Sequence, residues 1–210
     1  MEKEFGLSKE EYKILKGLNT PKKIQGFVSK LKVNFEYNGE TCMSPRRVLR
    51  EGKAHCVEAA MLAALCLRLQ GEKPLVVDLT ATKDDFDHVI CVFKREGKWG
   101  AISKSNHLAH RYREPIYRDI RELVMSIFHE WFDARGRKTL RSFSDPVDLS
   151  RFDYLNWETN EENVWDIPAY LGDIKHYSIL NRKQIAGLRK ADEFEIKLGN
   201  TREEEPVSKK

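Results

Sequence analysis

The chain has 210 residues, of which 40% are hydrophobic and 33% charged, and its formal net charge at pH 7 is +4. This length suffices for one domain with a substantial core, with or without an appendage. Lysine and arginine are interleaved with acidic residues almost throughout, whereas nucleic-acid and membrane-surface binders concentrate basic residues on one face, so we expect neither kind of partner.

The chain also lacks the usual signals of a membrane or secreted protein. No window approaches the ~18 uninterrupted apolar residues of a transmembrane helix, and residues 1–4 lack the basic start of a signal peptide. We therefore expect a cytoplasmic protein. Its cysteines form no C-x-x-C pair, which predicts reduced thiols and argues against a zinc knuckle; they are Cys42, Cys56, Cys66 and Cys91.

Short helices are predicted in the N-terminal part of the chain. Ser8 and Glu11 form a capping-box pattern that opens the first of them. Pro21 suits the first position of the second helix, in which apolar residues recur at helical spacing. After a strand-like alternation over 33–37, Pro45 begins another short turn of helix that leads to the next segment.

The segment from Gly52 to Gly71 predicts a buried helix that begins with a cysteine. Residues 57–69 are almost all apolar or small and contain only two charges, so no polar stripe would face water. The N–H groups and dipole at a helix start favour thiolate and would lower the pKa of the Cys56 thiol. The competing interpretation is that Cys56 is a small buried hydrophobic residue, as unpaired cysteines usually are.

Three strands are predicted after this helix. Residues 75–79 are rich in β-branched side chains, and 88–93 are apolar at both parities, as in a strand buried on both faces. A tight turn then leads to a strand over 99–103. If the turn has two residues, paired positions in the hairpin sum to 193, and His88 and Ser103 share one face of the sheet.

The C-terminal half has a looser pattern. A polar connection over 104–114 precedes the longest predicted helix, which runs from Pro115 to Phe132. Residues 139–143 predict a last strand. The aromatic-rich segment 151–180 lacks a clear period and predicts an irregular covering, followed by a short helix over 181–188.

The order of the polar residues is that of a nucleophile, a general base and an orienting group, because His88 follows Cys56 by 32 residues and Ser103 follows by 15 more. Over roughly 19–133 the chain resembles the transglutaminase-like, papain-related superfamily. The motifs that carry this resemblance are Ser44-Pro45, Gly52-Lys53-Ala54-His55-Cys56 with Glu58, Leu69-Gln70-Gly71, Asp87-His88-Val89 and Gly97-Lys98-Trp99.

The resemblance implies that Cys56 is the nucleophile and His88 the base. The third member of the family's site is usually an aspartate four residues after the tryptophan, where this chain has Ser103. An aspartate orients the imidazole and stabilises its cation, whereas a serine hydroxyl can only orient the ring. We therefore expect weaker catalysis or a relocated third member.

Asn106, Ser105 and Asp78 are further candidates for the third position. Asn106 is a neutral orienter of the kind that papain-like sites use, Ser105 lies opposite His88 in the predicted register, and Asp78 on the neighbouring strand would supply a charge. The backbone N–H of Cys56 would provide one oxyanion donor.

The predicted fold is α+β and papain/transglutaminase-like, with the nucleophile helix packed on an antiparallel sheet. We assign residues 1–143 to the transglutaminase-like domain with its N-terminal helices, 144–200 to a C-terminal extension packed on it, and 201–210 to a disordered tail, because the tail is rich in charge and proline.

The functional prediction is a cysteine-dependent amide hydrolase or acyl transferase that acts on a protein or peptide. Hydrolysis is preferred because nothing indicates a second amine substrate. The competing hypothesis is a catalytically weak or inactive fold that binds proteins or peptides. No cofactor or metal is expected, since His107 and His110 have no partner ligand in register and fit a solvated loop better. The pattern specifies no oligomeric state.

Overall fold

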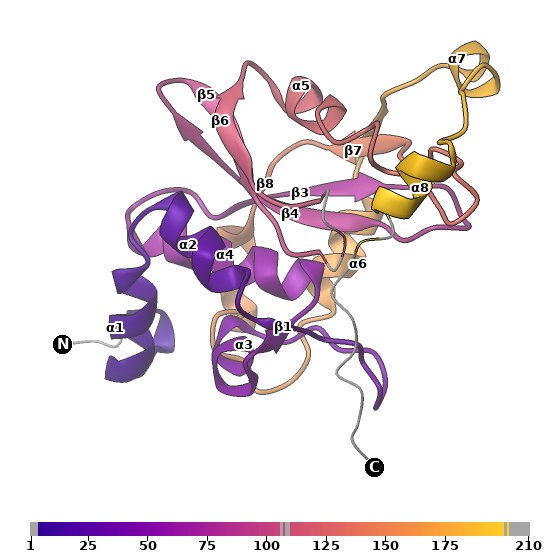
Figure 1. Ribbon diagram of the computed structural model, residues 1–210. Helices are drawn as coiled ribbons and strands as arrows, with labels where there is room; N and C mark the ends of the chain where they lie inside the picture. The colour runs from indigo at the N-terminus through magenta and orange to yellow at the C-terminus, as the bar shows by residue number, and fades with distance from the viewer. Residues whose placement is uncertain (1–3, 106, 108–109, 200, 202–210) are drawn as a thin grey trace.

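The computed structural model describes residues 4–105, 107, 110–199 and 201. They form a mixed α+β fold around a seven-stranded sheet whose paired strands are all antiparallel (Figure 1). The strand order is β6-β5-β4-β3-β7-β9, and β8 also pairs with β3. The strands are β3 (Leu75–Thr80), β4 (His88–Arg95), β5 (Lys98–Ile102), β6 (Arg113–Tyr117), β7 (Ser142–Ser144), β8 (Val147–Asp148) and β9 (His176–Ser178).

The register of the β4–β5 hairpin confirms the predicted two-residue turn. Cys91 pairs with Ile102 and Val92 with Ala101, so paired residues sum to 193. The predicted strand over 75–79 is likewise found as β3.

One face of the sheet is covered by the N-terminal helices, with α4 (Cys56–Leu69) against the strands and α1, α2 and α3 around it (Figure 1). The elements that precede α4 are η1 (Glu4–Gly6), α1 (Lys9–Gly17), α2 (Pro21–Val28), β1 (Lys32–Val33), α3 (Pro45–Glu51) and β2 (Lys53–Ala54). β1 and β2 form a separate two-stranded parallel pair. Every residue of α4 from Val57 to Leu67 is buried, as its lack of a polar stripe predicts.

The helix starts follow the local sequence signals. Ser8 caps α1 with a complete capping box, and Pro21 and Pro45 occupy first-turn positions of α2 and α3. Of the residues in the alternation predicted over 33–37, only Val33 lies in a strand, β1.

The prediction of a long helix from Pro115 to Phe132 is wrong. Pro115 lies within β6, the outermost strand on its side of the sheet, and only Ile120–Met125 form a helix, α5, capped by Asp119. Proline is tolerated in an edge strand because that strand leaves some of its N–H groups outside the ladder. The apolar residues of α5 instead cover the face of the sheet opposite α4.

The C-terminal part is more regular than predicted and contributes to the sheet. The segment 151–180 contains most of η2 (Leu149–Leu155), all of α6 (Asp166–Asp173) and β9. Because β7 spans Ser142–Ser144 and both β8 and β9 belong to the sheet, the 144–200 segment completes the sheet as well as packing on it.

The last described elements are two short helices. The helix predicted over 181–188 is found as α7 (Arg182–Ala186), which Asn181 caps, and α8 (Glu193–Gly199) follows it. The tail predicted over 201–210 lies outside the described residues, apart from Thr201. Within the described ranges, no helix combines the length and the apolar character needed to cross a membrane.

Candidate active site

A cleft of about 480 Å³ opens where α4 and β4 begin, and Cys56 and His88 line it. Residues 130–133 form part of its wall. A larger hollow of about 620 Å³ lies between 145 and 175, but none of the described residues that line it is a cysteine or histidine. The residues suited to nucleophilic chemistry therefore gather in the smaller cleft.

Ser103 holds the His88 ring in one orientation. The Ser103 hydroxyl donates to the carbonyl oxygen of His110 at 2.9 Å, so it must accept from His88 Nε2, which lies 2.7 Å away. The Ser103 backbone is fixed in turn by Gln25, which both accepts from its N–H and donates to its carbonyl at 3.0 Å. With Nε2 occupied, Nδ1 is the ring nitrogen of His88 that is available to the thiol.

Two histidines, His55 and His88, line the same cleft as the Cys56 thiol and act on its pKa. Burial would raise its pKa, but the contacts with His55 and then His88, together with their positive charges, lower the pKa to about 5. Burial instead raises the pKa of the remaining thiols, Cys42, Cys66 and Cys91. Cys56 is therefore the thiolate of the chain near neutral pH.

His55 lies between the thiol and two carboxylates. Its Nε2 donates to the carbonyl oxygen of Thr41 at 2.9 Å and lies 3.4 Å from Glu58 Oε1 and 3.6 Å from Glu36 Oε1. Burial would lower the pKa of His55, but the contact with Cys56 and the charge of Glu58 raise it to about 9. The ring is therefore a cation at neutral pH.

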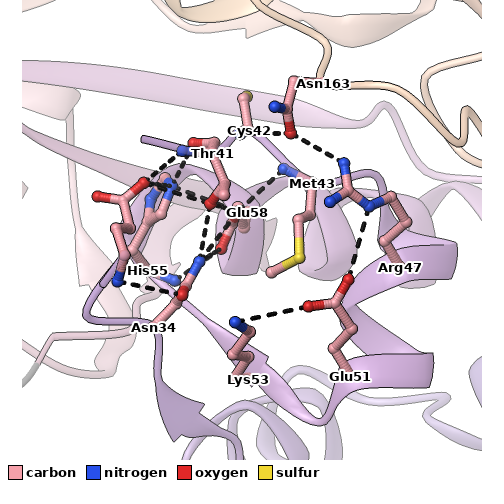
Figure 2. A network of polar contacts seen from close by, with 11 residues as sticks. Asn34, Thr41, Cys42, Met43, Arg47, Glu51, Lys53, His55, Glu58 and Asn163 are labelled. Atoms are coloured by element: carbon pink, nitrogen blue, oxygen red, sulfur yellow. Dashed lines mark hydrogen bonds and ion pairs between the residues drawn. The ribbon is translucent and has the colours of Figure 1, made fainter. Parts of the chain in front are cut away.

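Glu58 is completely buried and is the centre of the polar network shown in Figure 2. Its carboxylate accepts from the backbone N–H groups of Met43 and His55, both at 2.9 Å. It also accepts from Thr41 Oγ1 at 2.8 Å and from Asn34 Nδ2 at 3.2 Å. These donors satisfy a charge that would otherwise be costly to bury.

His55 and Glu58 belong to the site, although the sequence pattern predicts no catalytic role for either. Their spacing is nevertheless a usable signal, because an acidic residue three positions after a helix N-cap reaches back to the N-cap N–H. The contact from His55 N–H to Glu58 has this form. The ring's approach to Glu36 depends on the loop before α3, which no local pattern specifies.

Asp78 does not contact His88. In the β3–β4 register, Leu79 pairs with His88, so the neighbouring Asp78 lies on the opposite face of the strand. There Asp78 Oδ2 and His176 Nε2 share a hydrogen bond of 2.9 Å. Burial raises the pKa of the Asp78 carboxyl to about 6, against the lowering effect of His176. Asp78 thus ties β3 to β9.

Asn106 and Ser105, the remaining candidates for the third position, belong to the 104–114 connection. Asn106 lies outside the described residues. The Ser105 hydroxyl accepts from the backbone N–H of His107 at 3.0 Å. Of the described candidates, Ser103 is the one whose hydrogen bond reaches the base.

The expectation that His110 lies in a solvated loop is wrong. Its ring packs on Trp131 with 4.4 Å between centroids, and none of the described residues bonds its buried Nε2. Burial and the charge of His88 lower the pKa of His110 to about 3. The His110 ring is therefore a neutral part of the cleft wall. Among the described residues, no group of three or more His, Cys, Asp or Glu side chains is arranged to hold a metal ion.

No protein-family model and no curated protein matches the chain. A function is therefore inferred from the geometry of the site. The site brings together a low-pKa thiol, an oriented imidazole and the first N–H groups of α4. Such N–H groups lack intrahelical acceptors and point toward negative charge at a helix start. This combination is suited to acyl transfer through sulfur.

Proposed function

We propose that this protein is a cysteine-dependent amide hydrolase or acyl transferase of transglutaminase-like type, with a papain-like placement of α4 against the antiparallel sheet. The observation that carries the proposal is the Cys56 thiolate beside an imidazole whose far nitrogen is fixed by Ser103. A protein or peptide amide is the proposed substrate, and hydrolysis is preferred over transfer to an amine.

In the acylation step, Cys56 Sγ attacks the amide carbonyl carbon and forms a C–S bond while the carbonyl π electrons move to oxygen. The N–H of Cys56 is placed to donate to that oxyanion. When the oxyanion collapses, the C–N bond breaks, and protonated His88 Nδ1 gives its proton to the departing amine. The product is a thioester on Cys56 and a neutral His88.

In the second step, His88 Nδ1 removes a proton from water, whose oxygen attacks the thioester carbonyl. The C–S bond then breaks, the acid leaves, and Cys56 returns as the thiolate beside protonated His88. If an amine replaced water, the same step would form a new amide. Ser103 would keep the Nε2 proton in place throughout but would add no negative charge, so His88 should be a weaker base than one paired with an aspartate.

The test uses p-nitrophenyl acetate, an activated ester that needs no knowledge of the natural substrate. Wild type should release a burst of p-nitrophenol and carry an acetyl group on Cys56, detected by intact and peptide mass spectrometry. Cys56→Ser should lose the burst. His88→Gln should acylate but release acetate at least tenfold more slowly.

A quenched-fluorescence peptide mixture then tests amide cleavage, with Cys56→Ser as the blank. Equal deacylation in wild type and His88→Gln, with no peptide cleaved, would contradict the enzyme proposal. Retained binding of those peptides would then favour a peptide-binding module.

A further inference from the structure

The two histidines at Cys56 differ in what binds their far nitrogens. Each ring has its Nε2 engaged by an oxygen, which leaves Nδ1 for the thiol. The oxygen behind His88 is a neutral hydroxyl, whereas carboxylates stand behind His55. The negative charge that the usual aspartate would supply is therefore present on the other side of the nucleophile.

We propose that His55 is a second catalytic histidine, a permanent cation that stabilises the Cys56 thiolate, and that Glu58 is the positioning residue that holds it charged. The catalytic consequence rests on the proposed function, but the charge pairing can be measured without any substrate. His88 would then serve mainly in proton transfer.

The geometry allows the His55 ring to carry two protons at once. The Thr41 carbonyl can only accept, so Nε2 keeps its proton, and the nearby Glu58 and Glu36 oxygens offset the positive charge. Nδ1 can then donate to the thiolate.

Among the described residues, ionisable groups from neighbouring elements also act on the sulfur. His88, at the start of β4, lines the same cleft and lowers the pKa of the thiol. Cys42 also interacts with Cys56, but burial raises the pKa of Cys42 so far that it stays a neutral thiol. Asp78 acts through its charge alone and is paired with His176 on the opposite face of β3. His55 and His88 are therefore the two histidines whose interaction with Cys56 favours the thiolate.

Glu58 cannot move away from this arrangement. It is fully buried, and its four hydrogen-bond donors come from three separate parts of the chain. The carboxylate also accepts from the backbone N–H of His55, so one residue fixes the main chain and the charge of the same histidine. Glu36 is more exposed and also accepts from the N–H of Thr41, so it supports the same loop.

This division of roles has a chemical consequence. His88 must lose and regain a proton during each proposed cycle, and a thiolate paired with His88 alone would lose its counter-charge whenever that ring was neutral. A fixed cation at His55 keeps the sulfur stabilised both as the attacking nucleophile and as the leaving group of the thioester.

The first test is the pH dependence of Cys56 alkylation by iodoacetamide in wild type and the matched variants His55→Gln and His88→Gln. Both glutamines are neutral and can still donate a hydrogen bond. We expect His55→Gln to raise the apparent pKa of the thiol by at least one unit, and by at least as much as His88→Gln does. An unmoved midpoint in a folded His55→Gln protein would overturn the proposal.

The second test measures the reciprocal effect and does not alter His55. The pKa of His55, followed by the NMR shift of its Hε1 proton, should fall by at least one unit in Cys56→Ala because two coupled charges shift each other equally. Glu36→Gln should lower it as well. A histidine with a merely structural role would titrate identically in all three proteins, and that result would refute the inference even if His55→Gln failed to fold.

Ester and peptide turnover separate this inference from the proposed function. Absence of all turnover in wild type, with the alkylation and NMR shifts as expected, would refute the enzyme proposal and leave the charge pair established. Normal turnover with no pKa shift in either experiment would support the enzyme proposal and refute the charge pair.

Discussion

Removal of the Ser103 hydroxyl should both destabilise the fold and slow the step that depends on His88. In Ser103→Ala, two polar groups lose their partner: the buried His88 Nε2, which lies 2.7 Å from the hydroxyl, and the partly buried His110 carbonyl, which lies 2.9 Å from it. Each unsatisfied group costs about 1–3 kcal/mol, so the free energy of unfolding should fall by roughly 2–6 kcal/mol.

Ser144 provides a matched control for this loss of stability. Its buried hydroxyl also bridges two groups, since it accepts from the N–H of Asp78 at 3.0 Å and donates to the carbonyl of Asp145 at 2.9 Å. Ser144→Ala should therefore lose a similar amount of stability. It does not line the cleft, so its chemistry should be unchanged.

The two variants are compared by urea unfolding and by the rate at which acetyl-Cys56 is hydrolysed, at a temperature where both are folded. Loss of the hydrogen bond that orients His88 removes about 1–2 kcal/mol of transition-state stabilisation, which slows deacylation by about 5- to 30-fold in Ser103→Ala. Equal deacylation rates in Ser103→Ala, Ser144→Ala and wild type would refute the role of Ser103 as the orienting residue.

The shifted pKa values of Cys56 and Asp78 give two more testable outcomes. In native protein, mass-mapped iodoacetamide labelling should modify Cys56 far faster than the other three thiols, and its rate should be half-maximal near pH 5. If Cys56 were as well protected from labelling as Cys66, Cys56 would instead be a structural thiol. Burial raises the pKa of Asp78 from 3.8 to about 6, so the folded state binds the proton more tightly and stability from this group is lost as pH rises across that interval. Urea unfolding of Asp78→Asn, which can still bond His176, should lack this loss, and parallel pH profiles for wild type and variant would contradict the assignment.

The parts of the fold that the sequence predicted are those determined by local patterns. The apolar run of α4 can only be buried, and the Glu96-Gly97 turn sets the β4–β5 register by its length. That register places His88 and Ser103 within hydrogen-bonding reach, so the Ser103 contact was predictable. The nature of that contact, with the hydroxyl as acceptor from the ring, required the position of the His110 carbonyl.

The failures arise where tertiary contacts override a local pattern. The apolar spacing after Pro115 fits a helix. In the structure, however, Arg113–Tyr117 pair as an edge strand, and α5 begins only after its N-cap residue, Asp119. Asp78 belongs to the strand next to that of His88, yet strand alternation turns it to the other face. The partners of His55 come largely from 34–41, a loop whose path has no signature of its own.

The serine at position 103 and the glutamate at position 58 are complementary features of the same site. A carboxylate at position 103 could not donate to the His110 carbonyl. Its negative oxygens would instead lie against the partly negative oxygen of that carbonyl, at a position where Ser103 is only 3% exposed. Behind His55, by contrast, the Glu58 carboxylate accepts from four donors. The local hydrogen-bond pattern therefore accommodates a buried negative charge on the His55 side of the sulfur and a neutral hydroxyl on the His88 side. A serine in place of the aspartate that the family resemblance predicts therefore does not by itself imply an inactive site, because in the proposed arrangement His55, which precedes Cys56 in the chain, supplies the charge that stabilises the thiolate.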